Sequence, residues 1–584
     1  MRTSLPALLA PLALLAAPAA AGPADDLNAV VAEHWRWYLG ENPVSASAWG
    51  YKGHEGRLDD PSLAAQDRAA ATAAGFLRRL QAVPDAGLGP GDRVNKAVLA
   101  RMLGEQAEGD RYPQRAVLLT SYASWFQNFV AMADTLPFAT ARDYESYLAR
   151  LAGWPAYDQA AIATTRVAIR DGLTQPCAVL GGVEKSIAGL IADRPEDTRY
   201  WRPFAAARPA AVAEAEWTSL QGRARRLIAE VVMPENRRLL AFYRDEYRPR
   251  CRPTVGAAAL PQGAAWYAFR VRAETTTDLT PARIHAIGLD EVKRIGAEMD
   301  ALASRTGHPS RAAFVAGLRT DPRHYARTPA ELLAAAALQA KTLDGLMPRF
   351  FRVTSRLPYG VRPIPAETAE GTTTAYYQPG SPDAGVAGSF YVNTSKLDQR
   401  PLWELPALAA HEGVPGHHHQ IARAQELPLP GFRRYAAGFT AYVEGWGLYS
   451  ERLGIEMGLY DTPEKEMGRL SYEMWRACRL VVDTGLHAMG WDKRRAVAFM
   501  RANTALSDAN IDAEVNRYIS WPGQALAYKL GELRIRALRA EAERALGAKF
   551  DLKGFHEAVL GQGPLPLDVL DGQVRAWIAA ERAG

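Results

Sequence analysis

The chain has 584 residues, of which 48% are hydrophobic and 23% are charged, and these proportions are those of a globular protein with a large core. Its formal net charge of +5 is the surplus of 69 Lys and Arg over 64 Asp and Glu. No run of like charges forms a basic arm, so nucleic acid is not an expected partner. Three cysteines are too few for a disulfide scaffold, although Cys177 and Cys251 could pair in an oxidising compartment.

The first 21 residues have the pattern of a secretory signal peptide. Arg2 precedes an apolar stretch from Leu5 to Leu15, and the small residues up to Ala21 fit an A-x-A cleavage site. No cysteine follows that stretch to carry a lipid, and no later segment is apolar for the roughly 18 residues that a membrane span needs. We therefore expect an exported protein, periplasmic or secreted, that is soluble after removal of the signal and has no membrane span.

Helical patterning dominates the rest of the chain and predicts a mostly α-helical fold. The clearest helices are expected at 25–38, 63–83, 219–244 and 281–304, the last with Thr280 as N-cap and Pro281 at its first position. Because no repeat or low-complexity linker follows the signal, we expect residues 22–584 to form a single domain. Its N-terminal lobe would cover about 22–250 and its metal-bearing part about 251–584.

Strand signals are scarce. The segments 372–378 and 388–394 are rich in β-branched and aromatic residues and are separated by prolines and glycines, which predicts a small hairpin or sheet. The second segment ends shortly before His411, so it is expected next to the helix described below. Either its exposed edge pairs with the backbone of an extended peptide, or the hairpin only braces the helices.

A cluster of histidines beside a glutamate follows. Residues 411–419 read HEGVPGHHH, and a His-Glu pair followed by a further His is how a helix of a zinc peptidase supplies two ligands and a general base. The usual H-E-x-x-H separates its histidines by four residues, whereas His417 lies six residues after His411 and Pro415 intervenes. The motif therefore predicts a metal site with unusual local geometry.

Pro415 and Gly416 predict a bulge or kink in a helix that otherwise covers 402–425. If two residues loop out, His417 occupies the place of the second ligand. If the helix runs on, His418 returns to the face of His411, but about 10.5 Å further along the axis. We prefer His417 for this reason, and we expect His419 and Gln420 to lie behind the ligands or at the surface.

The third ligand is expected on a neighbouring helix. Glu444 lies in the apolar, aromatic stretch AYVEGWGLYSERL, where a buried carboxylate needs a metal ion or an ion pair to compensate its charge. Glu451 shares its helix face and could hydrogen-bond a ligand histidine, but a surface role is favoured for it.

Two later segments could complete the site. One helical face offers either a wet cleft or an internal ion-pair network, and it is formed by Glu473, Arg476, Leu480, Asp483 and His487. Further polar residues flank the Trp521-Pro522-Gly523 break, namely Glu514, Arg517, Tyr518, Tyr528, Lys529 and Glu532. Zinc peptidases use a Tyr or His to donate a hydrogen bond to the developing oxyanion, and the candidates for this role are Tyr518, Tyr528 and His487.

Four sequence blocks in order, HEGVPGHHHQ, AYVEGWGLYSERLG, RLVVDTGLHAMGW and EVNRYISWPGQALAYKLG, carry a resemblance over most of the mature chain. They resemble the bacterial family known as domain of unknown function 885 (DUF885), whose members resemble zinc metallopeptidases. The resemblance implies a large, mostly helical, cleft-containing fold similar to thimet oligopeptidase and angiotensin-converting enzyme, with a gluzincin-type site. Dipeptidyl peptidase III has a similar motif with one extra residue between its histidines, whereas this chain has two.

These features together predict an exported zinc metallopeptidase that acts on short peptides, the size limit being implied by the resemblance alone. His411, His417 and Glu444 would bind Zn²⁺, and Glu412 would act as general base. The chain has neither a G-x-S-x-G elbow nor a phosphate-binding loop. The alternatives are a non-catalytic protein that binds metal or peptide, and a metal-dependent hydrolase of another amide or ester.

Overall fold

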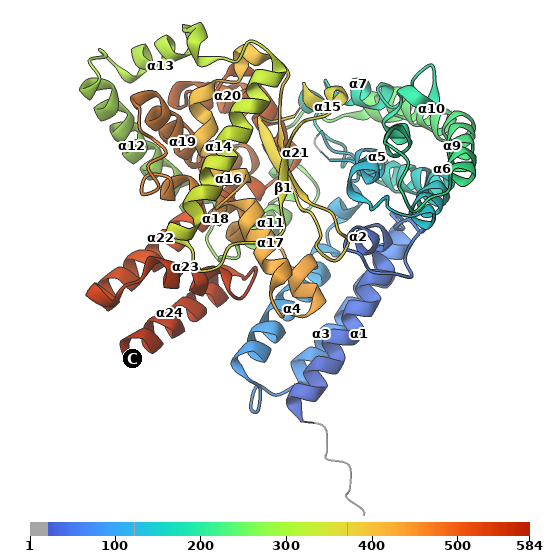
Figure 1. Ribbon diagram of the computed structural model, residues 1–584, viewed down its shortest axis with the longest axis horizontal. Coiled ribbons are helices and arrows are strands. Elements are labelled where there is room, and N and C mark those ends of the chain that lie inside the picture. The colour runs from blue at the N-terminus through green and yellow to red at the C-terminus, as the bar shows by residue number, and fades with distance from the viewer. Residues whose placement is uncertain (1–21, 122, 371, 584) are drawn as a thin grey trace, which may run out of the picture.

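Helices form most of the regular structure in the part of the chain that the computed structural model describes, residues 22–121, 123–370 and 372–583 (Figure 1). The predicted mostly α-helical class with one small sheet is confirmed. The predicted signal peptide lies outside the described residues. Within them, no helix combines the length and the apolar character that crossing a bilayer requires.

Helices α1 to α10 form the first part of the chain. The helices predicted at 25–38 and 63–83 are confirmed as α1 and α3, and the Ser62 hydroxyl caps α3 by accepting a hydrogen bond from the Ala65 N–H at 3.2 Å. The bounds are α1 Pro23–Glu41, α2 Pro43–Ala48, α3 Leu63–Ala82, α4 Pro90–Gly109, α5 Trp125–Thr135, α6 Ala141–Arg170, α7 Val183–Ala188, α8 Arg202–Ala205, α9 Glu214–Leu227 and α10 Met233–Phe242.

The helix predicted over 219–244 is present, but it is not one regular α-helix. A π-helical turn at Ile228–Val232 separates α9 from α10, and a second one at Tyr243–Tyr247 follows α10. Pro234 stands at the start of α10, where its ring would clash with the carbonyl of Glu230 in a regular helix. The wider turn accommodates the proline, so one predicted helix becomes two.

Buried apolar side chains form two large clusters. One consists of residues between Leu119 and Tyr247, and the other joins side chains of α1, α3 and α4 to those of the C-terminal helices. The disulfide left open by the sequence is formed between Cys177 and Cys251, with Cα atoms 5.0 Å apart, and Cys251 packs against the first cluster. Cys478 is a buried free thiol. The division into lobes near residue 250 stays a prediction.

Helices α11 to α24 form the second part. The Thr280 cap is confirmed, because its hydroxyl accepts a hydrogen bond from the Arg283 N–H and Pro281 begins α12. The bounds are α11 Gly263–Thr275, α12 Pro281–Arg305, α13 Arg311–Thr320, α14 Pro329–Phe350, α15 Ala366–Ala369, α16 Leu405–Glu412, α17 His417–Glu426, α18 Thr440–Leu453, α19 Pro463–Ala488, α20 Lys493–Asn503, α21 Asp508–Ser520, α22 Ala527–Leu546, α23 Leu552–Leu560 and α24 Leu567–Ala583.

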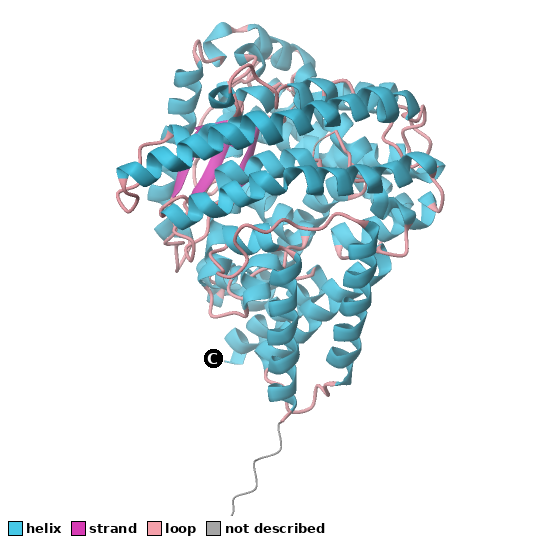
Figure 2. Cartoon of the chain, turned by 90° about the vertical axis from the view of Figure 1, so that its right-hand side faces the viewer, coloured by secondary structure: helices cyan, strands magenta, loops and turns pink. Residues whose placement is uncertain are grey.

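A three-stranded sheet lies next to long helices that cross in front of it in Figure 2. Both predicted strands are present but shorter, as β2 Ala375–Gln378 and β3 Gly388–Val392, and they pair antiparallel. The sequence missed β1 Tyr359–Pro363, which pairs parallel to β3. Its five residues include a glycine, an arginine and a proline, so its strand signal is weak.

The position of the strands corrects the expectation of an exposed edge at 388–394. The order is β1-β3-β2, and β3 is buried along its whole length in the centre of the sheet. β2 is an edge strand instead, and the sheet packs against α14, α16 and α17. Any pairing with an extended peptide beside α16 would therefore involve β2.

Helices α18 and α22 pack with their backbones in close approach. A methyl group on Gly531 of α22 would lie 1.8 Å from the carbonyl oxygen of Ala441 in α18, and one on Gly445 would lie 2.5 Å from the backbone of Gly531. Only glycine fits at such separations. This pair of glycines therefore sets how closely α22 lies against the helix that carries Glu444.

We predict that Gly531→Ala lowers the free energy of unfolding by about 1–3 kcal/mol or more, because the added methyl group forces the helices apart. Gly572→Ala in α24 is the matched control, since nothing lies within 4 Å of its Cβ position. Replacing glycine by alanine in a helix without a clash should leave stability unchanged or raise it by up to about 1 kcal/mol. Urea unfolding followed by circular dichroism measures both. Equal midpoints would contradict the close packing.

Candidate metal centre

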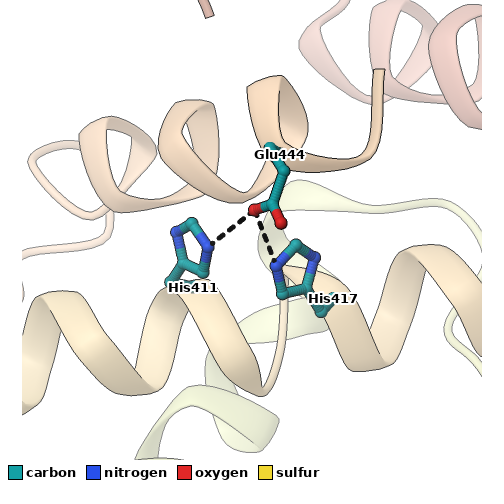
Figure 3. A group of neighbouring side chains, drawn as sticks. All are labelled: His411, His417 and Glu444. Carbon is teal, nitrogen blue, oxygen red and sulfur yellow. Dashed lines mark ion pairs between the residues drawn. The ribbon is translucent and has the colours of Figure 1, made fainter. Parts of the chain in front are cut away.

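The segment between His411 and His417 is a break between two helices. α16 ends at Glu412, Gly413 to Gly416 form a turn in which the Val414–Pro415 peptide bond is cis, and α17 begins at His417 (Figure 3). The interruption predicted at Pro415-Gly416 within 402–425 is present, but it divides the segment into two helices, because Pro415 can neither donate to the carbonyl of His411 nor pack against it within a helix. The turn still brings the two histidines together, with ring centroids 4.6 Å apart.

Glu444 of α18 supplies a third donor atom. Its Oε2 lies 3.4 Å from Nε2 of His411 and 3.2 Å from Nε2 of His417 (Figure 3), and ligand atoms of the three residues lie within 4.8 Å of one another. A charge-assisted N–H···O bond is shorter, about 2.7–2.9 Å, and this oxygen makes no hydrogen bond among the described residues. Zinc ligands at about 2.0–2.1 Å in a tetrahedron lie about 3.3 Å from one another. The two separations from Oε2 of Glu444 thus match the spacing of zinc ligands.

The electrostatics of the cluster are those of a cation site. Burial lowers the pKa of His411, but the carboxylates of Glu444 and Glu451 outweigh it and raise the pKa to about 9. Against the effect of burial, His417 and His411 hold the pKa of Glu444 well below its ordinary value. Because imidazole binds metal in its neutral form, metal binding would release protons from this cluster.

The residues Glu444 to Gly447 of α18, with the sequence EGWG, explain how this helix packs against the two histidines. A methyl group on Gly447 would lie 2.7 Å from Cε1 of His411, so a larger residue would push the imidazole away. The indole N–H of Trp446 donates to the Pro415 carbonyl oxygen at 2.8 Å and holds the turn between α16 and α17. Contacts from two successive residues of α18 therefore fix both the ring of His411 and the turn that positions His417.

Glu451 corrects a prediction. The surface role favoured for it is wrong, because it is only 1% exposed and its Oε1 lies 2.8 Å from Nδ1 of His411. Arg476 of α19 pairs with the same oxygen at 2.9 Å. A carboxylate on Nδ1 directs Nε2 of His411 toward Glu444 and fixes the tautomer that binds metal.

The three residues after His417 point elsewhere and are buried. His418 faces a separate cavity of about 570 Å³ and packs against the tilted ring of Tyr359, with its Nδ1 3.0 Å from the Tyr377 hydroxyl. Burial lowers its pKa to about 4. His419 packs against Phe351, and Gln420 donates to a backbone carbonyl of α18. The surface location considered for His419 and Gln420 is thus excluded, and His417 rather than His418 adjoins His411.

A pocket of about 290 Å³ opens beside the three donors. Glu412 lines it together with His411, His417 and Glu444. The edge strand β2 contributes Ala375, Tyr376 and Tyr377, and Thr373 lies two residues before it. The opposite wall contributes Trp475, Arg476, Arg479, Arg517, Trp521, Gln524 and Tyr528. The proposed general base and the edge strand therefore share one cavity with the metal ligands.

Of the three oxyanion candidates, the structure places Tyr528 at the pocket and the others elsewhere. Nη2 of Arg517 and Nε2 of Gln524 both lie 3.4 Å from the Tyr528 hydroxyl. The Tyr518 hydroxyl accepts hydrogen bonds from Trp475 and Arg479 outside the pocket.

His487 is a structural residue. Its Nδ1 accepts a hydrogen bond from the Ala257 N–H at 3.0 Å, and its Nε2 lies 2.9 Å from the Tyr518 carbonyl oxygen. Burial lowers the pKa of His487 to about 4, which keeps it neutral. With both ring nitrogens used, it has no free atom to offer a substrate.

The polar face predicted on α19 is mainly an internal ion-pair network. Lys529 is fully buried and lies 3.0 Å from each of Glu473, Glu291 and Glu532. Asp483 accepts a hydrogen bond from the Tyr267 hydroxyl at 2.6 Å. Among the residues predicted for this face of α19, Arg476 lines the pocket.

The sequence analysis missed Arg479, Trp475 and Gln524 at the pocket. Arg479 follows Arg476 by one helical turn in an otherwise apolar stretch, and this spacing was the available signal. Gln524 follows the Trp-Pro-Gly break, and its direction depends on the turn that Gly523 makes with positive φ.

Comparison with known proteins agrees with this architecture. Residues 43–574 match the family described as bacterial protein of unknown function (DUF885), and the chain belongs to this family. A crystal structure described as a "putative lipoprotein" from Colwellia psychrerythraea is 26% identical, with a TM-score of 0.89 over 96% of this chain and 100% of that one. A second, a "putative lipoprotein of unknown function" from Shewanella oneidensis, shares the fold at 19% identity, with a TM-score of 0.67 over 95% and 99% of the two chains. None of the curated proteins matches.

We predict that His417→Gln and His418→Gln, changes at successive positions of α17, differ in their effect on metal binding. Loss of His417 removes a donor atom and should weaken zinc binding by about a hundredfold or more. Loss of His418 should leave the stoichiometry of bound zinc unchanged, because its ring faces the other cavity. Elemental analysis and competition with a chromogenic chelator measure this. A larger loss in His418→Gln would contradict the ligand set.

We predict that Glu451→Gln weakens zinc binding about tenfold to a hundredfold without abolishing it, because the carboxylate orients His411 and increases its basicity. Glu456→Gln, which removes only a surface ion pair with Arg539, is the control. The same chelator competition measures both. Equal affinities in the two variants would show that Glu451 does not act on the ligand.

Proposed function

We propose that this protein is an exported zinc metallopeptidase that hydrolyses short peptides. The observation that carries the proposal is the spacing of 3.2 and 3.4 Å between one buried carboxylate oxygen and two imidazole nitrogens, which fits a tetrahedral zinc ion better than a direct ion pair. Two His and one Glu are also the ligand set of catalytic zinc sites that leave one position open. A bound zinc ion would supply Lewis acidity, which acidifies water and polarises a carbonyl oxygen.

Glu412 is the proposed general base. It follows the ligand His411 directly and lines the same pocket as His417 and Glu444. Its carboxylate would take a proton from the water that attacks the carbonyl carbon, and would then give that proton to the nitrogen of the leaving amine. The two transfers leave Glu412 in its starting state.

Tyr528 is the proposed donor to the developing oxyanion. Arg517 and Gln524 present N–H groups to its hydroxyl oxygen, so the hydroxyl hydrogen can point into the pocket. Burial and the nearby Glu444 raise its pKa, which keeps the hydroxyl protonated. A donor of this kind contributes about 3 kcal/mol to transition-state stabilisation by analogy with other oxyanion donors.

The edge strand β2 supports a peptide substrate. β2 pairs with β3 on one side, and its residues line the pocket that contains the metal ligands. An extended peptide could pair with the remaining edge and thereby present a peptide bond to the site. The small volume of the pocket favours short peptides.

Export is supported by the signal-like N-terminus and by the disulfide Cys177–Cys251, since disulfides persist in oxidising compartments. The two structural relatives are described as lipoproteins, which are exported proteins. A periplasmic or secreted location would give access to short peptides outside the cytoplasm.

We predict that the zinc-loaded protein cleaves members of a short-peptide library and that Glu412→Gln lowers kcat by about 10²-fold to 10⁴-fold while zinc content is retained. Mass spectrometry of the digest and elemental analysis measure the two effects, and Glu456→Gln serves as control. Full activity in Glu412→Gln would refute the role of the base. If zinc binds but no peptide is cleaved, the protein is a binding protein or hydrolyses another amide or ester.

A further inference from the structure

Three arginines line the pocket of the metal centre. Arg476 and Arg479 come from α19 and Arg517 from α21. All three are at least nine-tenths buried, with exposed fractions of 3%, 2% and 8%. Since a buried guanidinium remains charged, each of these charges requires compensation.

The three arginines pair with carboxylates behind this wall. Arg476 is paired with Glu451 at 2.9 Å. Arg479 and Arg517 share a single carboxylate, that of Glu514, at 2.8 and 3.8 Å. Glu514 therefore faces two guanidinium groups.

Arg479 also keeps an unused donor. Its Nε donates to the Tyr518 hydroxyl at 2.9 Å and its Nη2 to Glu514, whereas Nη1 is buried without a hydrogen-bond partner among the described residues. Buried donors of this kind are almost always satisfied in folded proteins. An acceptor from a molecule bound in the pocket would satisfy Nη1.

We propose that Arg479 and Arg517 bind a carboxylate of the substrate, and that this group is the C-terminal carboxylate of the peptide. The proposal rests on the peptidase function proposed above. A guanidinium presents a planar fork of donors that matches a carboxylate, and it remains protonated at any physiological pH. Trp475 and Tyr528 line the same pocket, and their ring centroids lie 4.5 and 4.0 Å from the guanidinium carbon of Arg479, so the rings hold the fork in place.

The distance to the metal ligands limits the length of the released fragment. The ring of Tyr528 lies 6.3 Å from the ring of His411 and 4.0 Å from the guanidinium carbon of Arg479. The ring of His411 and the guanidinium carbon of Arg479 are therefore at most about 10 Å apart. An extended peptide advances about 3.3 Å per residue. A peptide held by its C-terminal carboxylate would place a bond one to three residues from its end at the metal centre.

Binding of four acetylated peptides to zinc-loaded Glu412→Gln, measured by calorimetry, tests the proposal without turnover. Two peptides with neutral side chains differ only in a free or an amidated C-terminus. The other two are amidated and differ only in Glu or Gln near the end. We expect the free acid to bind about tenfold to a hundredfold more tightly than its amide, and the Glu and Gln peptides to bind alike.

The outcomes separate the two sources of a carboxylate. Preference for the Glu peptide without preference for the free acid would place a side-chain carboxylate at the arginines and overturn the assignment to the C-terminus. No discrimination within either pair would overturn the carboxylate site itself. Neither comparison requires a change in the arginines, so a folding defect cannot imitate the result.

Arg517→Gln in the same background gives a second test. It should reduce the ratio of acid to amide affinity toward one, whereas Arg501→Gln, which removes an exposed pair with Asp508, should leave the ratio unchanged. Digestion by the wild-type protein then reports fragment length, and we expect C-terminal fragments of one to three residues. If the wild type cleaves nothing while Glu412→Gln still prefers the free acid, the peptidase function fails and the carboxylate site stands.

Discussion

The carboxylate of Glu444 lies between two imidazoles inside the protein, and the surrounding structure depends on this arrangement. A charge removed from water must be compensated, and His411 and His417 approach it from two different helices. Two glycines of α18 allow close packing on two sides of this helix. Gly447 allows contact with His411, and Gly445 allows contact with Gly531 of α22. The second contact brings Tyr528 and Lys529, both near the start of α22, close to the helix that carries Glu444.

Further buried carboxylates lie behind the site, and cations from other helices neutralise them. Glu451 of α18 pairs with Arg476 of α19, Glu473 of α19 pairs with Lys529 of α22, and Glu514 of α21 pairs with Arg479 of α19. Removing one partner would leave an unpaired buried charge, which costs far more free energy than losing a surface pair. These pairs therefore fix the relative orientation of the helices around the pocket and hold His411, His417 and Glu444 in position.

The four sequence blocks that carry the family resemblance meet in one place. The first block covers parts of α16 and α17, the second α18, the third α19, and the fourth α21 and α22. All four blocks contribute residues to the pocket, the third through Arg479. Membership of the DUF885 family and the fold shared with two lipoprotein structures define the architecture. The peptidase activity is our inference from the chemistry of the residues that these blocks bring together.

The sequence by itself determined the mostly helical class, most helix positions, both antiparallel strands and the three donors His411, His417 and Glu444 as candidates, because periodicity and residue chemistry are local properties. The tertiary structure decided what depends on other segments. Residues distant in sequence made β3 a central strand, buried Glu451 against His411, turned His418 into another cavity and moved Tyr518 and His487 away from the pocket. Local spacing shows which residues share a helix face, but the packing of other helices determines which atoms that face meets.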